Sequence, residues 1–232
     1  MITARPPIVV FDLDGTLADT ARDLISTLNV LLLRENLPCV DLDAARYLVG
    51  AGARALIERG FALNGADLSP ERIALLVDDF LAHYEAHIAD ETQLFPGVPT
   101  ALERLSQAGF RLAICTNKPE PLARRLLDAL SLSQQFSAIC GRGSFLVHKP
   151  DPEMLRLTID AAGGDHNRAI MVGDSKTDID TARNAAIPVI AVDFGYTDVP
   201  IASLGPNKVI SHFDELWAAT QELLPSDAPQ RA

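Results

Sequence analysis

No apolar stretch of this sequence approaches the ~20 residues that a membrane-spanning helix needs. The first apolar run, within MITARPPIVVFD, is also far too short for a signal peptide, so we expect neither a membrane protein nor a secreted one. Positive charge is scarce, and the formal net charge is -11. Non-specific nucleic-acid binding needs clustered Lys and Arg to neutralise phosphates, so this class is disfavoured. The composition favours a small-molecule partner.

Cysteine is rare, and its placement bears on the cellular compartment. The three cysteines, Cys39, Cys115 and Cys140, are odd in number, widely spaced and set in apolar surroundings. We therefore expect buried free thiols and no disulfide framework. Free thiols are typical of a reducing environment, so we expect a cytoplasmic protein. The sequence leaves the oligomeric state open between a monomer and a homodimer.

Hydrophobic residues make up 48% of the chain and charged residues 22%, which are ordinary values for a folded globular protein. Short apolar runs, each followed by a polar or Gly-containing turn, predict buried strands at 8–11, 112–115, 170–172 and 189–192. Helical patterns at 100–108, 120–130 and 152–162 separate them. Alternating strands and helices indicate a Rossmann-like parallel sheet covered on both faces, and ligands bind such sheets at the carboxyl ends of the strands.

Residues 18–93 differ from the rest because they show helical periodicity without a strand-like run. Ser69-Pro70-Glu71 is a typical helix start, with a capping hydroxyl and a proline in the first turn. We therefore expect an α/β protein in which residues 1–17 and 94–232 form the sheet body. Residues 18–93 would form a small helical cap domain inserted after the first strand, with linkers near 17–19 and 89–93.

The motif with the most chemical content is Phe11-Asp12-Leu13-Asp14-Gly15-Thr16-Leu17, at the end of the first predicted strand. Asp12 and Asp14 can point into one site if the chain leaves the extended form after Asp12, and Gly15 permits that turn. A bare pair of aspartates is more often a turn. Further polar elements after other strand ends favour a functional site here.

Two of those elements could contact a phosphoryl group. Thr116-Asn117 follows the strand that ends near Cys115 and supplies a hydroxyl and an amide suited to phosphate oxygens. Lys149 lies in a proline-flanked loop before a helix and could place a positive charge beside the phosphoryl group. Taken alone, the first is typical of a helix cap and the second of a surface lysine.

A third element, Gly173-Asp174-Ser175-Lys176-Thr177-Asp178, adds two carboxylates after the strand at 170–172. Taken alone, it is also typical of a helix N-cap. Carboxylate oxygens are the ligands that Mg²⁺ prefers. Converging carboxylates without a cation would repel one another, and bound Mg²⁺ together with Lys149 resolves that conflict. We therefore expect a Mg²⁺ cofactor.

These four motifs, in this order and spanning essentially the whole chain, resemble those of the haloacid dehalogenase superfamily of phosphohydrolases. The resemblance implies that Asp12 attacks phosphorus and that Asp14 protonates the leaving oxygen and then activates water. It also implies a Mg²⁺ site made by the Asp12 carboxylate, the Asp14 carbonyl and Asp174, with Asp178 in contact directly or through water. Thr16, Thr116, Asn117 and Lys149 would contact the substrate phosphate. Because dehalogenases of the superfamily lack the second aspartate, Asp14 disfavours C–Cl hydrolysis.

The helical insertion resembles the small cap of a subgroup that contains phosphoglycolate phosphatase, β-phosphoglucomutase and phosphonoacetaldehyde hydrolase. Lysine is absent from residues 18–93, which removes the Schiff-base lysine that the last of these needs. Within this region, Val49-Gly50-Ala51-Gly52-Ala53-Arg54 opens a helix and could hold an anion, with Gly52 and Arg54 as substrate contacts. The alternative is an ordinary flexible helix start. Asp19-Thr20 and Asp193-Phe194-Gly195-Tyr196 also resemble segments of phosphoglycolate phosphatases.

The expected function is therefore Mg²⁺-dependent hydrolysis of 2-phosphoglycolate to glycolate and phosphate through a phosphoaspartate on Asp12. A phosphatase acting on a sugar or amino-sugar phosphate is the first alternative, since related caps accept such substrates. A β-phosphoglucomutase-like phosphomutase is the second, because it uses the same core motifs. A non-enzymatic phosphate sensor is disfavoured because every core position needed for turnover is present.

Overall fold

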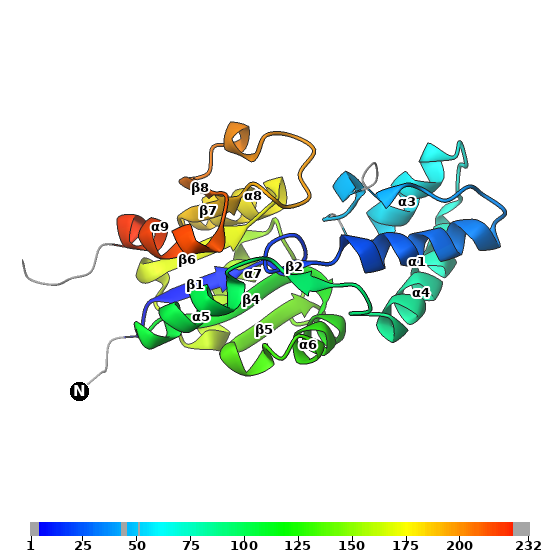
Figure 1. The fold of residues 1–232 in the computed structure, drawn as a ribbon. Coiled ribbons are helices and arrows are strands. Elements are labelled where there is room, and N and C mark those ends of the chain that lie inside the picture. The colour runs from blue at the N-terminus through cyan, green and yellow to red at the C-terminus, as the bar shows by residue number, and fades with distance from the viewer. Residues whose placement is uncertain (1–4, 43–45, 51, 225–232) are drawn as a thin grey trace, which may run out of the picture.

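The computed structural model describes residues 5–42, 46–50 and 52–224, and it contains a six-stranded parallel sheet in the order β5-β4-β1-β6-β7-β8 (Figure 1). The strands are β1 (Ile8–Phe11), β4 (Arg111–Pro119), β5 (Ala138–Arg142), β6 (Ala169–Gly173), β7 (Val189–Val192) and β8 (Lys208–Ile210). The order turns back on itself at β1, which lies between β4 and β6. This is the position where ligands bind in doubly wound sheets.

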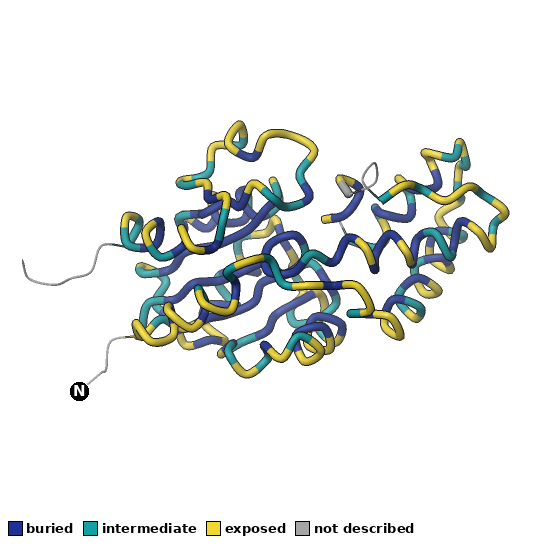
Figure 2. Tube along the Cα trace, in the orientation of Figure 1, coloured by how far each residue is buried: buried dark blue, intermediate teal, exposed yellow. Residues whose placement is uncertain are grey.

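Both faces of the sheet are buried because successive side chains of a strand point to opposite sides. In β1, Val9 and Phe11 pack into one hydrophobic cluster, and Ile8 and Val10 pack into another. Figure 2 shows the strands as the most buried part of the body. Such uniformly apolar runs are typical of parallel strands covered on both faces.

Helices cover the two faces of the sheet in separate groups. The first cluster contains side chains of α5 (Val98–Gln107), α6 (Glu120–Ala129) and α9 (Leu216–Leu223). The second contains side chains of α7 (Pro152–Ala162) and α8 (Lys176–Ala185). The expected α/β, Rossmann-like parallel sheet is therefore confirmed.

Three further helices pack against one another at one side of the sheet, beyond the carboxyl end of β1 (Figure 1). They are α1 (Ala21–Arg34), α3 (Ala53–Leu63) and α4 (Pro70–Ala86). Ser69 caps α4 by accepting a hydrogen bond from the Arg72 N–H. The two chain crossings to the body form a short antiparallel pair, β2 (Ala18–Asp19) with β3 (Gln93–Leu94).

Some features differ from the sequence-based expectations. The edge strands β5 and β8 were not predicted, because their apolar runs are short, Ala138-Ile139-Cys140 in β5 and Val209-Ile210 in β8. Cys115 and Cys140 are buried free thiols as expected, but the prediction was wrong for Cys39. Cys39 is exposed because it lies in an irregular segment after α1, where no element covers it. Within the described residues, no helix is long and apolar enough to span a bilayer.

Candidate active site

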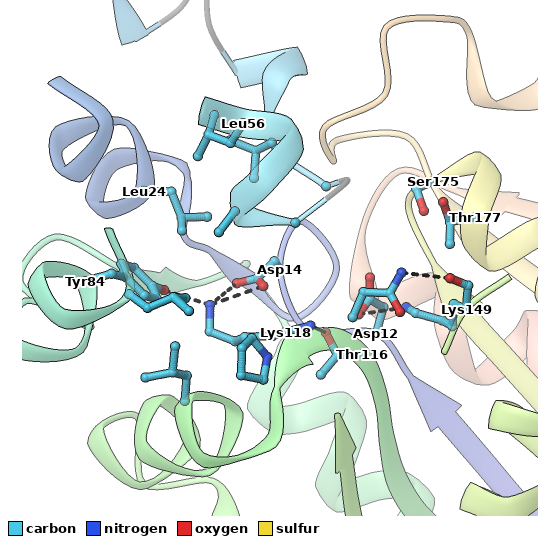
Figure 3. Close-up of a pocket in the computed structure, with 18 of the residues that line it drawn as sticks. Asp12, Asp14, Leu24, Leu56, Tyr84, Thr116, Lys118, Lys149, Ser175 and Thr177 are labelled. Carbon is cyan, nitrogen blue, oxygen red and sulfur yellow. Dashed lines mark hydrogen bonds and ion pairs between the residues drawn. The ribbon is translucent and has the colours of Figure 1, made fainter. Parts of the chain in front are cut away.

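Several of the residues singled out in the sequence line a pocket between the carboxyl ends of the strands and the three helices α1, α3 and α4 (Figure 3). The body contributes Asp12, Asp14, Thr116, Asn117, Lys118, Lys149, Ser175 and Thr177. The helical side contributes Leu24, Gly50, Gly52, Ala53, Leu56, Phe80 and Tyr84. The pocket therefore has a polar floor and a largely apolar roof, as small-molecule sites commonly do.

The turn after β1 brings the first motif into the site. Gly15 has φ +81°, a conformation that favours glycine, and a Cβ there would lie 2.5 Å from Asp174 Oδ2. The chain can therefore pass close to Asp174 only with glycine at this position. Thr16 follows and donates its hydroxyl to Asp174 Oδ1 at 2.8 Å. Thr16 was expected to contact the phosphate, yet here it orients a carboxylate of the cluster.

Lys149 joins two buried carboxylates. Its Nζ lies 3.0 Å from Asp12 Oδ1 and 2.6 Å from Asp178 Oδ1, and its side chain is almost fully buried. Burial lowers the pKa of the Lys149 ammonium, but Asp12 and Asp178 outweigh it and hold this pKa above the ordinary value. Lys149 therefore stays charged beside Asp12.

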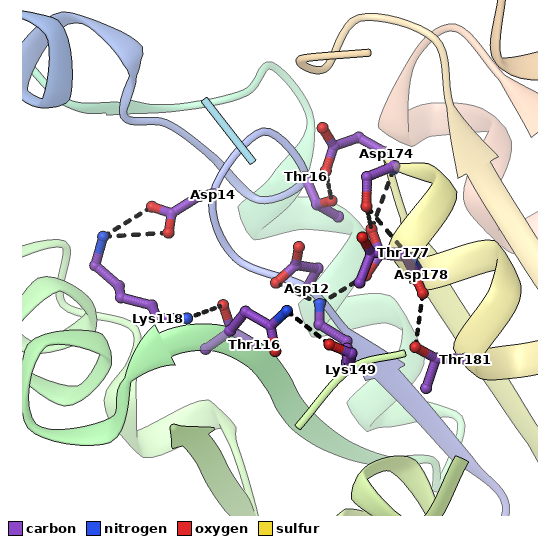
Figure 4. A network of polar contacts seen from close by, with 12 residues as sticks. Asp12, Asp14, Thr16, Thr116, Lys118, Lys149, Asp174, Thr177, Asp178 and Thr181 are labelled. Carbon is purple, nitrogen blue, oxygen red and sulfur yellow. Dashed lines mark hydrogen bonds and ion pairs between the residues drawn. The ribbon is translucent and has the colours of Figure 1, made fainter. Parts of the chain in front are cut away.

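A cluster of three buried carboxylates fits a cation. One oxygen from each of Asp12, Asp174 and Asp178 lies within 4.8 Å of the other two (Figure 4). One lysine charge cannot balance three carboxylates. The donors are all hard oxygen ligands, which suit Mg²⁺ better than a softer transition metal. The residues therefore fit the expected metal.

The oxygens of the cluster differ in how they are already engaged. Asp178 accepts from Lys149 on Oδ1 and from the Ser175 N–H and hydroxyl on Oδ2, at 3.1 and 2.6 Å. By contrast, Asp12 Oδ1 accepts no hydrogen bond within the described residues, although it is paired with Lys149. Both oxygens of Asp174 also accept hydrogen bonds, Oδ1 from the Thr16 hydroxyl and Oδ2 from the Tyr196 N–H.

Burial raises the pKa values of two carboxylates in the cluster. It raises the pKa of Asp12 to about 6, a shift that Lys149 opposes and that Asp178 and Asp14 reinforce. Burial also raises the pKa of Asp174 to about 8, with the charges of Asp178 and Asp12 acting in the same direction. Perturbed carboxylates of this kind, facing a pocket, are typical of catalytic or metal sites.

Asp14 turns away from Asp12 and forms an ion pair with Lys118, at 2.9 and 3.2 Å (Figure 4). Lys118 Nζ also donates to the Tyr84 hydroxyl at 2.8 Å. Asp14 and Lys118 belong to the sheet body, whereas Tyr84 belongs to α4. The contact therefore links the two sides of the pocket.

Thr116 and Asn117 line the pocket with Asp12, as expected, but they lie within β4, which continues to Pro119, and not after its end. Asn117 donates its side-chain amide to the Lys149 carbonyl at 3.0 Å, which holds the Lys149 loop against β4. The Thr116 hydroxyl accepts the Lys118 N–H at 3.2 Å. Each residue thus positions a lysine of the site in addition to lining the pocket.

The glycine-rich segment lies partly as expected. Gly50 and Gly52 line the pocket, and α3 begins at Ala53 without a side-chain cap, while Ala51 lies outside the described residues. Arg54 is not among the lining residues. Its Nε donates to Glu58 Oε1 at 2.8 Å, and the side chain is 59% exposed.

Sequence reasoning missed three residues of the site. Lys118 and Tyr84 line the pocket, and the Tyr196 N–H donates to Asp174 Oδ2 at 2.8 Å. A charged residue two positions after Thr116 was the available signal for Lys118. The sequence pattern placed Tyr84 among the apolar residues on the buried face of α4. Such a pattern does not distinguish a tyrosine that only packs from one that also binds a polar group.

The comparisons with known proteins agree with this site. A sequence-family model described as haloacid dehalogenase-like hydrolase matches residues 9–192. A phosphoglycolate phosphatase of Mesorhizobium japonicum is 49% identical over 94% of this chain and 96% of its own length. One from Agrobacterium fabrum is 48% identical, covering 97% of each chain. A crystal structure of a predicted phosphoglycolate phosphatase from Haemophilus somnus has a similar fold, with a TM-score of 0.85 and 28% sequence identity. The match covers 94% of this chain and 100% of the Haemophilus somnus chain.

The family model, the relatives and the fold all indicate one protein family. The aspartate motif after β1 and the buried carboxylate cluster indicate the same family. The match includes the strands that carry Asp12, Thr116 and Asp174. This chain belongs to the haloacid dehalogenase-like hydrolases.

Proposed function

We propose that this phosphatase hydrolyses 2-phosphoglycolate to glycolate and phosphate, with Mg²⁺ as cofactor and a phosphoaspartate on Asp12 as intermediate. The observation that carries the proposal is the placement of Asp12, which is buried, charge-paired with Lys149 and directed at a pocket shared with α3. Relatives that are 49% and 48% identical and carry the name phosphoglycolate phosphatase support the substrate.

In the first half-reaction, an oxygen of Asp12 attacks phosphorus and the bond from phosphorus to the glycolate oxygen breaks. Asp14, in its protonated form and released from Lys118, gives a proton to that leaving oxygen. In the second half-reaction, Asp14 takes a proton from a water molecule, which attacks phosphorus and releases phosphate from Asp12. One group thus serves as acid and then as base, and the difficult displacement is divided into two easier ones.

The residues around Asp12 stabilise the charge on the phosphoryl group. Lys149 stays protonated between Asp12 and Asp178, so it keeps a fixed positive charge beside the reacting atoms. Asp12, Asp174 and the Asp14 carbonyl would hold Mg²⁺, with Asp178 acting through water. When bound, the cation would neutralise the carboxylates and polarise the phosphoryl oxygens.

We further propose that residues 18–93 act as the cap domain of a body made by 1–17 and 94–232, and that the cap selects the substrate. The body residues recognise the phosphoryl group, so discrimination must come from groups on the other side of the pocket. The first N–H groups of a helix have no partner within it, and α3 has no side-chain cap. Gly52 and Ala53 line the pocket and can therefore donate to the substrate carboxylate.

A comparison of three substrates tests the proposal. 2-Phosphoglycolate should have a higher kcat/KM than ethyl phosphate, which lacks the carboxylate, and than glucose 6-phosphate. Ala53→Pro removes one N–H at the first position of α3, where helices tolerate proline. It should lower kcat/KM for 2-phosphoglycolate by an amount equivalent to about 1–3 kcal/mol and change ethyl phosphate little.

Arg54→Ala is the matched control for that experiment. Arg54 was expected to assist the carboxylate, and its pairing with Glu58 indicates a smaller effect than that of Ala53→Pro. If Ala53→Pro slows both substrates equally, α3 does not hold the carboxylate. A preference for glucose 6-phosphate would overturn the substrate assignment and leave the chemistry at Asp12 intact.

A further inference from the structure

Tyr196 connects the carboxylate cluster with the first helix of the cap. It lies in the segment that follows β7, and its side chain is buried. Its backbone N–H donates to Asp174 Oδ2 at 2.8 Å. Its phenol oxygen accepts the N–H groups of Thr20 and Ala21, at 2.7 and 2.9 Å, where α1 begins. One residue therefore touches both a candidate metal ligand and the start of the cap.

The segment around Tyr196 fits closely against the site. A Cβ on Gly195 would lie 2.2 Å from the Cβ of Asp174, and a Cβ on Gly15 would lie 2.8 Å from the Tyr196 ring. Real Cβ atoms do not approach neighbours this closely. The Tyr196 segment is therefore packed tightly against both Asp174 and the turn at Gly15. A displacement of Asp174 must therefore move the Tyr196 backbone and with it the phenol.

The start of α1 has an unusual cap. Thr at an N-cap normally has an extended backbone, and its hydroxyl accepts an N–H of the first turn. Thr20 instead has φ -94° and ψ -2°, a helical conformation, and makes no such bond. Its hydroxyl is fully buried and has no hydrogen-bond partner within the described residues. The Tyr196 phenol instead accepts the N–H groups of Thr20 and Ala21, and it donates its own hydroxyl to Asp19 Oδ1 at 2.9 Å.

The phenol thus holds the first linker and the start of α1 against the body. Asp23, in the first turn of α1, accepts the N–H groups of Glu91 and Thr92, so the same helix is also hydrogen-bonded to the second linker.

We propose that Tyr196 is a positioning residue that couples cation binding at Asp174 to the orientation of the cap, through its N–H to Asp174 and its phenol at the start of α1. The inference rests on the proposed function, since it takes the carboxylate cluster as a Mg²⁺ site and residues 18–93 as a cap. A cation that fixes Asp174 would fix the Tyr196 backbone, which favours the contact of the phenol with α1. The coupling free energy between two sites is reciprocal, so the contact of the phenol with α1 in turn raises the affinity of the cluster for the cation.

The first test measures Mg²⁺ affinity by calorimetry without substrate. Tyr196→Phe keeps the ring and the N–H to Asp174 and removes the phenol oxygen. It should raise the Kd for Mg²⁺ by roughly fivefold or more, because the change removes the phenol's hydrogen bonds with Asp19, Thr20 and Ala21. Tyr47→Phe, which removes an exposed phenol oxygen elsewhere in the cap, should leave the Kd unchanged. An unchanged Kd in Tyr196→Phe would overturn the coupling.

The second test follows the cap directly. Spin labels at Asp78→Cys on α4 and Ser106→Cys on α5, both exposed positions, report the distance between cap and body in a Cys39→Ser background. Mg²⁺ should narrow the distance distribution of the parent protein. Tyr196→Phe should abolish that response. If Mg²⁺ has no effect on the parent, or the same effect on the variant, the inference is wrong.

Ala21→Pro gives the same test from the cap side and covers the case in which Tyr196→Phe does not fold. Ala21 is the first residue of α1, a position where proline is tolerated, and the change removes one N–H that Tyr196 accepts. A proline also disfavours the helical conformation of the preceding Thr20. The variant should weaken Mg²⁺ binding as Tyr196→Phe does, and normal binding would contradict the coupling.

The outcomes separate this inference from the proposed function. Loss of phosphate release or of Mg²⁺ dependence in the unaltered protein would refute the proposed function. A wild-type enzyme that is fully active with Mg²⁺, together with a Tyr196→Phe variant that keeps the Mg²⁺ response of the cap, would refute the inference alone.

Discussion

Lys118 Nζ lies 2.9 Å from Asp14 Oδ1, and the ammonium group is buried while the carboxylate is 17% exposed. The same ammonium lies 4.4 Å from the centre of the Tyr84 ring and donates to its hydroxyl. Burial lowers the pKa of Lys118, but Asp14 and Tyr84 outweigh it and hold this pKa above the ordinary value. The residue proposed as acid and base is therefore held by a permanent positive charge that also contacts the cap.

Asp14→Asn should slow alkyl phosphates far more than p-nitrophenyl phosphate. The amide keeps an oxygen that accepts from Lys118, so the local structure should persist, but it cannot deliver a proton. p-Nitrophenolate leaves without protonation, whereas an alkoxide needs it. Steady-state rates on both substrates give the comparison, and equal losses would remove Asp14 from the acid role.

Asp12→Asn should abolish turnover and leave the fold intact. The amide has the size of the carboxylate but lacks its nucleophilic charge. Phosphate release and the circular dichroism spectrum of the purified variant are the measurements. Substantial residual turnover would show that another group attacks phosphorus.

Lys149→Ala should be far more damaging than Lys176→Ala. Removing Lys149 leaves Asp12 and Asp178 buried without their partner, which costs about 3–5 kcal/mol when one member of a buried ion pair is lost. Lys176 is 71% exposed and pairs with Asp180 one turn along α8. Thermal unfolding and kcat/KM measure the difference, and similar effects in the two variants would contradict the site geometry.

Without metal, the protein should lose stability as pH rises from 5 to 8. Folding raises the pKa of Asp174 from 3.8 to about 8, so in this range the folded state keeps a proton that the unfolded chain has released. Unfolding is then favoured by rising pH, because the unfolded state binds fewer protons. Mg²⁺ removes the penalty by binding the charged cluster in the folded state.

Melting temperatures in EDTA and in Mg²⁺ test this at both pH values. The increase that Mg²⁺ produces should be larger at pH 8 than at pH 5. EDTA should also eliminate phosphate release, and added Mg²⁺ should restore it. A Mg²⁺ effect on stability that is largest at pH 5 would show that the raised pKa of Asp174 does not govern the apo protein.

Much of the fold could be predicted from local patterns. The run at Ile8–Phe11 is apolar at every position because both faces of β1 are buried, and such a run identifies a parallel strand without knowledge of its neighbours. Ser69-Pro70 marked the start of α4 through the chemistry of a helix cap. The edge strands β5 and β8 were missed because their pairing, and not their composition, makes them strands.

The candidate site residues of the body could be proposed from the sequence, because Asp12, Thr116, Lys149 and Asp174 belong to motifs whose order along the chain is distinctive. The partners of the charged and polar groups are visible only in the folded chain. It paired Asp14 with Lys118, directed Arg54 to Glu58 and brought Tyr196 to Thr20 across 176 positions of sequence. Such contacts depend on which elements pack together, and a local pattern of residue types carries no record of partners that lie so far apart in the chain.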